Sequence, residues 1–439
     1  MKKVCVVGLW HLGLVSATGL AEQGYEVVGV DSNADLISDL SQGCLPLFEP
    51  GLEELIKAGL SSRRLRFESN LVVVSQTETI LVTYDTSVDE NDEVDLTALE
   101  ETFTEMIPRL RRDSLVIMNS QVPVGSCEDW QRKIEESRPG ESIDLVYSPE
   151  NLRLGQAVSL FKRPDMIVIG AATERARKKA EDFYQIFPVE KFYVSLRTAE
   201  MAKHALNAFF ATSISFANEL GNLCDTVGAD GLQIAQILRA DSRIGAKAQV
   251  RPGLGFAGAT LARDLRVLQK VGKVEGVPTI LFDSVLEINK RQIDRVAKLV
   301  EDYFEGKLRD KMISVLGLTY KPGTSTLRRS ASLEIMKRLH SKGARLSAHD
   351  PKADMKEYSG EPFFKFSGDP YKACQGSQAL LLLTEWPEYK DLDYLKIKKS
   401  MALPFILDAK NHLDGEKLKE LGFIYLQIGR GQLQEALRR

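Results

Sequence analysis

A strand, a glycine turn, a helix and a second strand follow one another at the start of the chain. The short apolar run Lys3 to Val7 leads into a turn over Gly8 to Gly13, and a helical pattern covers Leu14 to Gln23. A second apolar run, Glu26 to Val30, ends at Asp31. Two strands connected through a helix are expected to lie parallel, because parallel strands need a crossover connection. The sequence therefore opens with a βαβ unit.

The same alternation continues along the chain of 439 residues and predicts more than one domain. Further strands are predicted at Thr79 to Thr83, Ser114 to Asn119, Asp144 to Ser148, Asp165 to Gly170, Met312 to Leu316, Arg345 to Ala348, Ala379 to Thr384 and Pro404 to Leu407. Between the two groups of strands, an uninterrupted helix is predicted from Thr198 to about Val227. We therefore predict an α/β fold with two Rossmann-like, doubly wound lobes, residues 1–195 and 306–439. A helical middle domain, residues 196–305, contains the long helix that joins them.

Composition excludes several partners. A net charge of −3 gives no reason to expect nucleic acid or an anionic membrane surface, and the apolar runs are too short to span a bilayer. Five widely spaced cysteines without a CxxC pair, and five histidines without ligand spacing, predict free thiols, a reducing cytoplasm and no metal site. The expected ligand is a small molecule.

The turn after the first strand matches two of the three glycines of a dinucleotide-binding fingerprint. Gly8 and Gly13 stand at the first and third glycine positions, while Trp10 stands at the second. Asp31, 23 residues after Gly8, is placed to accept hydrogen bonds from ribose hydroxyls, which favours NAD over NADP. The alternative is a nucleotide-free lobe in which Asp31 only caps a strand.

Several separated segments carry a more specific signal. In chain order they are Gly43 to Leu52 with Glu49-Pro50-Gly51, Val122 to Gly125, Ser148 to Arg153, Glu200 to Lys203, Asp241 to Gly245, Pro252 to Gly258, Arg263-Asp264, Gly317 to Pro322, Thr384 to Trp386 and Asp408 to Asn411. Together they resemble the UDP-glucose and GDP-mannose dehydrogenase family over nearly the whole chain. That resemblance implies an NAD-binding first lobe and a nucleotide-sugar-binding last lobe. It also implies oxidation of a nucleotide sugar twice at C6, with two NAD reduced.

The resemblance assigns roles to individual residues. Lys203 and Asn207, four residues apart on one helix face, would point at the sugar oxygen, where Lys203 would stabilise an alkoxide. Asp264 would hold that lysine or a water, and Glu150 matches the acid/base glutamate. The cofactor-binding residues implied are Gly8, Leu12, Gly13, Asp31, Thr83, Gln121, Arg263 and Arg328. The substrate-binding residues implied are Glu150, Asn151, Leu152, Arg153, Lys203, Asn207, Arg243, Gly245, Gly258, Lys321 and Lys410.

One residue departs from the family where its second oxidation takes place. The family uses a cysteine thiolate that forms a thiohemiacetal with the aldehyde, and Thr260 stands at that catalytic position. A threonine hydroxyl is far less acidic than a thiol and is a poor nucleophile without a base. Cys127, after the loop from Val122 to Gly125, is expected to be a small buried residue rather than a replacement.

Other departures surround the same chemistry. Gln121 replaces a threonine that positions the hydrolytic water, Leu154 replaces a glutamate, and Ala257 replaces a glycine. Ser325-Thr326 replaces an acidic pair. Lys410 stands where arginine is common, and lysine lacks arginine's bidentate grip on phosphate.

Three functions stay open on the sequence. The first is an NAD-dependent oxidoreductase that removes a single hydride from a nucleotide sugar. The second is an epimerase-like protein that retains NAD and uses transient oxidation, and the third is a non-catalytic nucleotide-sugar binder or partner subunit, which Trp10 favours. The base and sugar of the ligand are not determined. The long apolar helix predicts a homodimer, with Arg243 reaching the neighbouring site as the resemblance implies.

Overall fold

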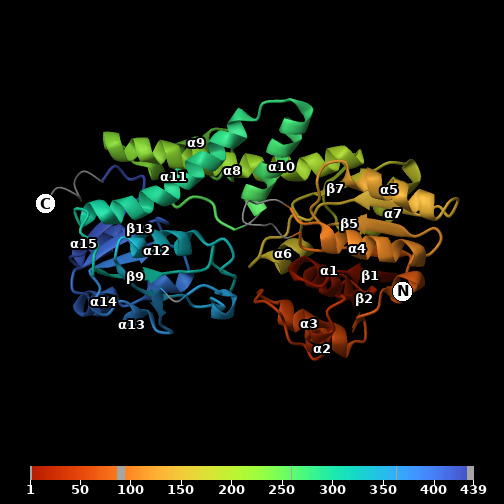
Figure 1. The fold of residues 1–439 in the computed structure, drawn as a ribbon, viewed down its shortest axis with the longest axis horizontal. Coiled ribbons are helices and arrows are strands. Elements are labelled where there is room, and N and C mark those ends of the chain that lie inside the picture. The colour runs from red at the N-terminus through yellow and green to blue at the C-terminus, as the bar shows by residue number, and fades with distance from the viewer. Residues whose placement is uncertain (1, 87–93, 259, 362, 433–439) are drawn as a thin grey trace. The chain divides into compact units, whose positions relative to one another are not determined.

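A computed structural model describes residues 2–86, 94–258, 260–361 and 363–432 (Figure 1). The chain divides into two compact units, Met1–Leu206 and Asn207–Arg439, and helix α8, Leu196–Val227, crosses the boundary in sequence. Each unit contains one sheet with helices packed on it. The fold class predicted from the sequence, two Rossmann-like lobes with a long central helix, is confirmed.

The first unit is built on a sheet of eight strands in the order β3-β2-β1-β4-β5-β6-β7-β8. The strands are β1 Lys3–Val7, β2 Glu26–Val30, β3 Leu65–Glu68, β4 Thr79–Val82, β5 Leu115–Met118, β6 Asp144–Tyr147, β7 Ile167–Ala171 and β8 Lys191–Val194. The helices are α1 His11–Glu22, α2 Ala34–Ser41, α3 Leu52–Ser61, α4 Thr97–Met106, α5 Ser126–Ser137, α6 Ala157–Lys162 and α7 Glu174–Tyr184.

Strand β1 shows why this sheet is covered on both faces. Val4 and Val6 belong to the hydrophobic core that includes Leu14 and Phe161, whereas Cys5 and Val7 belong to a second core on the other face. Successive side chains of a strand point to opposite faces, so an unbroken apolar run requires a cover on each. The second core includes Phe103 of α4 and Trp130 of α5, and the two cores make the lobe doubly wound.

The sheet differs from the expected all-parallel one at a single pair of strands. β7 runs antiparallel to β6, with Val146 opposite Ala171, while every other neighbouring pair in this sheet is parallel. Strand direction cannot be read from a local apolar run. The sequence analysis also left β3 and β8 unassigned. Arg66 interrupts the apolar pattern of β3, and β8 is a short strand of four residues, none of which is fully buried.

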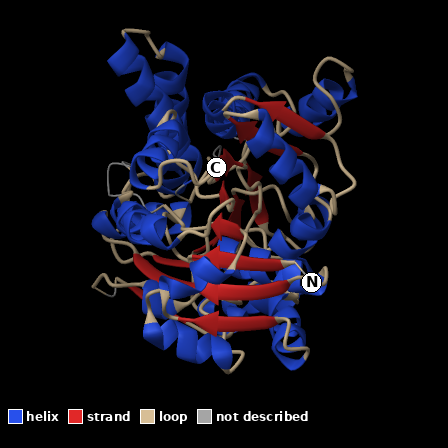
Figure 2. Ribbon diagram, turned by 90° about the vertical axis from the view of Figure 1, so that its right-hand side faces the viewer, coloured by secondary structure: helices blue, strands red, loops and turns tan. Residues whose placement is uncertain are grey.

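The second unit contains helices and a parallel sheet of six strands in the order β11-β10-β9-β12-β13-β14. The helices that precede its sheet in sequence are α9 Gly231–Ala240, α10 Thr260–Glu275 and α11 Ile280–Tyr303. Its strands are β9 Met312–Leu316, β10 Arg345–His349, β11 Phe364–Phe366, β12 Ala379–Leu382, β13 Phe405–Asp408 and β14 Ile424–Gln427, with α12 Ala331–Ser341, α13 Pro370–Ala373, α14 Tyr394–Ser400 and α15 Gly415–Glu420. Figure 2 shows strands and helices in separate colours.

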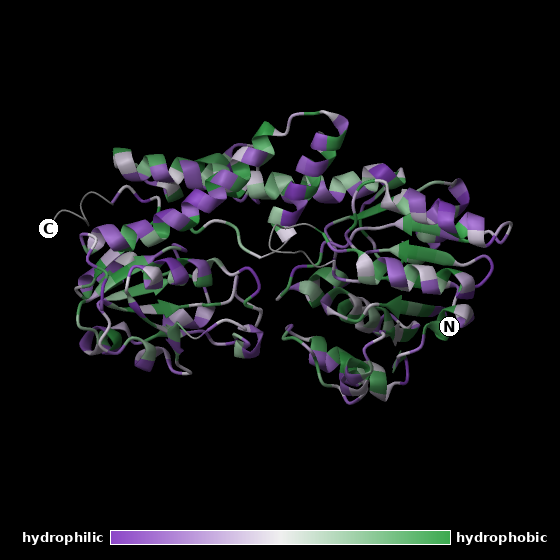
Figure 3. Ribbon diagram, viewed as in Figure 1, coloured by the Kyte–Doolittle hydropathy of each residue, from purple (hydrophilic) through white to green (hydrophobic). Residues whose placement is uncertain are grey.

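Hydropathy follows this architecture. In Figure 3 the strands of both sheets are coloured mainly hydrophobic, whereas the helices alternate between hydrophobic and hydrophilic residues along their length. That alternation is typical of helices with one face on a core and one in water. Among the described residues, no helix combines the length and apolarity needed to cross a bilayer.

Candidate active site

The carboxyl ends of five neighbouring strands meet at one edge of the first sheet. Val7 pairs with Val30 and Val82, and Val82 continues through Met118 to Tyr147. Ligands of open α/β sheets bind outside such ends. The predicted site residues that follow these strands are Gly8, Leu12 and Gly13 after β1, Asp31 after β2, Thr83 after β4, Gln121 after β5, and Glu150 to Arg153 after β6.

The turn after β1 requires both of its glycines. Gly8 has φ +94°, and a Cβ there would lie 3.0 Å from the backbone nitrogen of Tyr84. A Cβ on Gly13 would lie 1.8 Å from the carbonyl oxygen of Gly8, which also accepts a 2.8 Å hydrogen bond from the Thr83 hydroxyl. Helix α1 begins at His11, earlier than the predicted Leu14. The amides of His11 and Leu12 therefore form a helix N-terminus, where a pyrophosphate would bind.

Trp10 occupies the second-glycine position in an extended conformation. Its φ of −85° is available to any residue, so the turn forms without a glycine at this position. The residue is 39% exposed, and its side chain makes no capping hydrogen bond to α1. In the glycine fingerprint, the second glycine has no side chain, so the pyrophosphate can approach the backbone. In this chain, the residue at that position carries an indole side chain.

Asp31 differs from its counterpart in the second lobe, Asp350. Asp31 is partly exposed and accepts hydrogen bonds from the amides of Leu9, at 2.8 Å, and Asn33, at 3.0 Å. Asp350 is 4% exposed and accepts six hydrogen bonds, from Leu318 N, Thr319 N, Thr319 Oγ1, Trp386 Nε1, Lys352 N and Ala353 N. A carboxylate offers about four lone-pair sites. Of these two carboxylates, Asp31 is therefore the one with remaining capacity for ribose hydroxyls.

The loop after β6 is held by the lysine of α8. Lys203 is 8% exposed, and its Nζ donates to the Glu150 carbonyl at 2.6 Å and to Asn151 Oδ1 at 3.1 Å. Burial raises the pKa of the Glu150 carboxyl to about 7, although the Lys203 charge and a hydrogen bond from the Asn151 backbone oppose the rise. Leu152 packs on the core of this unit, and the exposed Arg153 lies 3.9 Å from Asp165. The structure thus brings Lys203, Glu150 and Asn151 together.

Gln121 is held by a histidine that the sequence analysis did not select. His204 is 1% exposed, its Nε2 lies 3.0 Å from the Val122 carbonyl oxygen, and its Nδ1 lies 3.4 Å from Gln121 Nε2. The carbonyl can only accept, so the imidazole donates through Nε2 and accepts the Gln121 amide through Nδ1. The one feature of the sequence that could have pointed to His204 is its position next to Lys203 on a predicted helix. A helical periodicity alone could not place its ring against a loop 82 residues earlier.

In the second unit, the predicted catalytic residues collect at the start of α10. Asn207 Nδ2 donates to Asp264 Oδ2, and Arg263 Nε lies 3.7 Å from Asp264 Oδ1. Both Arg263 and Asp264 are buried. Thr260 is the first residue of α10 and is exposed, so its hydroxyl stands in the first turn of a helix. Cys127, in the first unit, is buried in α5, and burial raises the pKa of its thiol well above the usual value.

The remaining substrate candidates, and the cofactor candidate Arg328, lie on loops of the second unit. Arg243 is exposed and bonds Asp241 through Nε, at 3.0 Å, and Nη2, at 2.7 Å. Gly258 has φ +79°, and a Cβ there would lie 3.0 Å from the Tyr320 ring. Lys410 Nζ lies 2.9 Å from Glu385 Oε2, which lowers the pKa of that carboxyl against the effect of burial. Gly245 has φ +90°, Lys321 Nζ lies 5.6 Å from the Tyr320 ring centre, and Arg328 is exposed.

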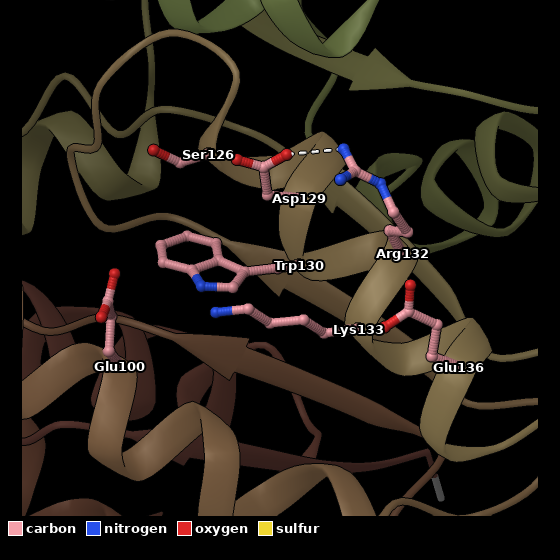
Figure 4. Close-up of a pocket in the computed structure, with 7 residues that line it drawn as sticks. All are labelled: Glu100, Ser126, Asp129, Trp130, Arg132, Lys133 and Glu136. Carbon is pink, nitrogen blue, oxygen red and sulfur yellow. Dashed lines mark hydrogen bonds and ion pairs between the residues drawn. The ribbon is translucent and has the colours of Figure 1, made fainter.

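A separate cavity of about 370 Å³ lies beside helices α4 and α5 of the first unit (Figure 4). It is lined by Glu100, Ser126, Asp129, Trp130, Arg132, Lys133 and Glu136. None of these is a predicted site residue. Within the described part of the chain, no cluster of three or more His, Cys, Asp or Glu side chains could hold a metal ion.

Comparison with known proteins identifies the same family along the whole chain. Three models of the UDP-glucose/GDP-mannose dehydrogenase family match it: the NAD binding domain at residues 2–188, the central domain at 197–291 and the UDP binding domain at 314–415. UDP-glucose 6-dehydrogenase TuaD of Bacillus subtilis is 34% identical over 98% of this chain and 94% of its own length. The UDP-glucose 6-dehydrogenase of Rhizobium meliloti is 32% identical over 98% and 99%.

Solved structures agree with this result. A UDP-glucose dehydrogenase from Pyrobaculum islandicum superposes with a TM-score of 0.89 at 31% identity, covering 97% of each chain. UDP-D-ManNAc dehydrogenase from Pyrococcus horikoshii superposes with a TM-score of 0.88 at 26% identity, covering 98% of this chain and 100% of its own. The similarity therefore extends through both lobes and the helices between them.

Proposed function

Because this chain belongs to the UDP-glucose/GDP-mannose dehydrogenase family, we propose that it removes one hydride from a nucleotide sugar and releases a carbonyl product. The family and its NAD-binding domain make the protein an NAD-dependent oxidoreductase that acts on a CH–OH group. The restriction to a single oxidation is the new element. It is supported by Thr260, the first residue of α10, which stands at the position where the sequence resemblance implies a catalytic thiol.

The observation that carries the proposal is the group formed by Lys203 and the loop after β6. The Lys203 ammonium is held at Glu150 and Asn151, and its charge acts on the Glu150 carboxyl. A fixed cation beside a sugar hydroxyl would stabilise the alkoxide that develops as hydride leaves. Glu150, with a pKa of about 7, can take the hydroxyl proton at neutral pH. NAD supplies the hydride acceptor.

The residues of the first lobe fit this cofactor. The turn at Gly8 and Gly13 presents the N-terminus of α1, and Asp31 keeps lone pairs for ribose hydroxyls. Leu12 contributes its backbone amide to this N-terminus. Thr83, which follows β4, supports the turn because its hydroxyl donates to the Gly8 carbonyl. The roles of Gln121, Arg263 and Arg328 toward the cofactor stay predictions.

Counting the products tests the proposal. Purified protein is incubated with NAD and a panel of UDP-, GDP- and ADP-sugars, and NADH is measured by absorbance while the sugar product is identified by mass spectrometry. One NADH per carbonyl product is expected. Two NADH with a uronic acid would refute the single oxidation, and an altered sugar without net NADH would indicate internal redox. Calorimetry that detects a sugar nucleotide but no NAD would favour a binding protein, the interpretation that Trp10 supports.

The pH dependence of the reaction follows from Glu150. Its folded pKa of about 7 lies above the ordinary 4.5, so the carboxylate form increases as pH rises through neutrality. We expect kcat/KM for sugar oxidation to rise about tenfold per pH unit below pH 7 and to level off above it, as for a base in the free enzyme. Reduction of the carbonyl product by NADH is expected to show the opposite slope. In Glu150→Gln, both slopes are expected to disappear, and their persistence would assign the titration to another group.

Helix α8 supports a homodimer. Phe209, Phe216 and Leu223 recur every seven residues on it and are 76%, 51% and 60% exposed in the single chain. An apolar stripe of this kind is typical of a helix that packs on a partner. We propose that it joins two copies, and light scattering should give twice the mass of the monomer. A monomer at micromolar concentration would contradict this proposal.

The three-domain division at residues 195 and 305, the cytoplasmic location and the contribution of Arg243 to a neighbouring site stay predictions. The substrate roles of Leu152, Arg153, Gly245, Gly258, Lys321 and Lys410 are proposals on the same basis. The nucleotide-sugar ligand itself is supported by the match to the UDP binding domain.

A further inference from the structure

A buried glutamate connects the cofactor turn to the loop that carries Glu150. The side chain of Glu49 is fully buried, and its Oε2 lies 2.8 Å from Nε2 of His11, the first residue of α1. The same oxygen accepts the Gly155 amide at 2.7 Å, and Oε1 accepts the Ala157 amide at 2.8 Å. One carboxylate thus holds the start of α1 and the end of the loop before α6.

The loop between β6 and α6 is tied at both ends. At its beginning, Lys203 binds the Glu150 carbonyl and Asn151, and Asn119 Nδ2 donates to the Ser148 carbonyl. At its end, the only side chain bonded to the amides of Gly155 and Ala157, among the described residues, is that of Glu49. The position of the segment from 148 to 157 therefore depends on Glu49 and, through it, on His11.

We propose that Glu49 and His11 are positioning residues that couple occupation of the cofactor turn to the order of the substrate loop. This inference rests on the proposed function, because it assumes that the turn takes a dinucleotide phosphate and the loop takes the sugar nucleotide. A phosphate at the N-terminus of α1 would bind the backbone amide of His11. When the His11 backbone is immobilised, its imidazole is restrained as well. The imidazole then restrains the Glu49 carboxylate, which holds the two loop amides.

The coupling arises from shared order rather than from a new contact. A first ligand that immobilises α1 reduces the conformational entropy that the second must remove when it orders the loop. Linkage requires the reverse effect to be equal: a sugar nucleotide on the loop tightens NAD binding by the same factor. Neither residue needs to touch a reacting atom.

Hydrogen exchange read by mass spectrometry tests the coupling without any turnover. In the wild-type protein, saturating NAD is expected to slow exchange of the peptide that spans residues 149–162. In His11→Phe, which keeps the backbone amide and a ring of similar size but removes the donor, this protection is expected to be lost while NAD still binds. Glu49→Gln is expected to behave similarly, because its NH2 group would face an amide donor.

A matched control is available on the same two helices. Glu22 of α1 and Lys162 of α6 form an exposed ion pair at 2.8 Å, at the end of α1 remote from the turn. Glu22→Gln removes a contact between the same two segments and should leave the NAD-dependent protection unchanged. Equal loss in Glu22→Gln and His11→Phe would show a general loosening of α6 and overturn the proposal.

A second measurement separates this inference from the proposed function. Calorimetry measures the Kd of NADH with and without saturating UDP-glucose, a pair that cannot react because no oxidant for the sugar is present. The ratio of the two Kd values is expected to be at least about fivefold for the wild type, within the usual range for coupled sites, and about one for His11→Phe. Retention of the wild-type ratio and protection in His11→Phe would refute the coupling, whatever the activity. Coupled protection without sugar oxidation would leave the inference standing and reject the function.

Discussion

Replacing Lys203 by methionine is expected to lower kcat for sugar oxidation by about 10²- to 10³-fold, the usual loss when one stabilising donor for a developing oxyanion is removed. The side chain keeps its length and its burial but loses the charge that Lys203 places beside Glu150. KM for NAD should change little, because the cofactor turn lies on other elements. Steady-state kinetics with the best sugar of the panel gives both constants.

The same substitution also removes a structural contact, so stability must be followed separately. Without the ammonium, the partly buried Glu150 carbonyl and Asn151 Oδ1 lose a donor. The cost is expected to stay below the roughly 1–3 kcal/mol of a fully buried acceptor, because water can reach partly buried groups. Thermal unfolding shows whether the variant is folded at the assay temperature. Lys57→Met, at an exposed lysine paired with Glu53, is the control for loss of one positive charge. A folded Lys203→Met protein with kcat within tenfold of wild type would reject the role.

Replacing Thr260 by cysteine is expected to restore the second hydride transfer. Thr260 is exposed at the first position of α10, so a thiol fits there and the helix N-terminus favours its thiolate form. The thiolate adds to the aldehyde, and the thiohemiacetal gives its hydride to a second NAD and becomes a thioester. The sequence resemblance implies that Gln121 replaces a threonine that positions the hydrolytic water, so release of the acid is expected to be slow. The result is a burst of one additional NADH per active site.

Intact-protein mass spectrometry detects the intermediate directly. The Thr260→Cys protein should carry a covalent adduct of the sugar nucleotide acyl group that hydroxylamine removes. Thr260→Ser, which keeps the hydroxyl and loses only the methyl group, is the control and should show neither burst nor adduct. If the cysteine variant shows no burst and no adduct although the first oxidation proceeds, Thr260 does not occupy the position of the nucleophile.

Local sequence was sufficient for the first lobe's turn and for its place at the sheet edge. The spacing of Gly8, Gly13 and Asp31 requires only a strand, a helix and a second strand, and the register of β1 against β2 then aligns Val7 with Val30. The grouping of Lys203 with Glu150 and Asn151 was also anticipated, but through resemblance to a family rather than through spacing. Fifty-three residues separate Lys203 from Glu150, and no periodicity connects them.

Other features of the fold and the site could not be predicted from local sequence patterns. The antiparallel direction of β7 depends on where the chain re-enters the sheet after the loop and α6, which an apolar run does not encode. Glu49 looked like part of a loop motif, and His11 like a residue of the glycine turn. Their contact, and that of His204 with Gln121, joins segments 38 and 83 residues apart.

By itself the sequence determined the alternation of strands and helices, the two-lobed class, the cofactor turn and the absence of a thiol at position 260, because each follows from residue type and short-range spacing. Only the tertiary structure decided which polar groups are buried and what they contact: the raised pKa of Glu150, the saturation of Asp350 and the Glu49 bridge. Burial and hydrogen bonding are set by segments that meet across the fold, and a one-dimensional pattern holds no information about which of them will meet.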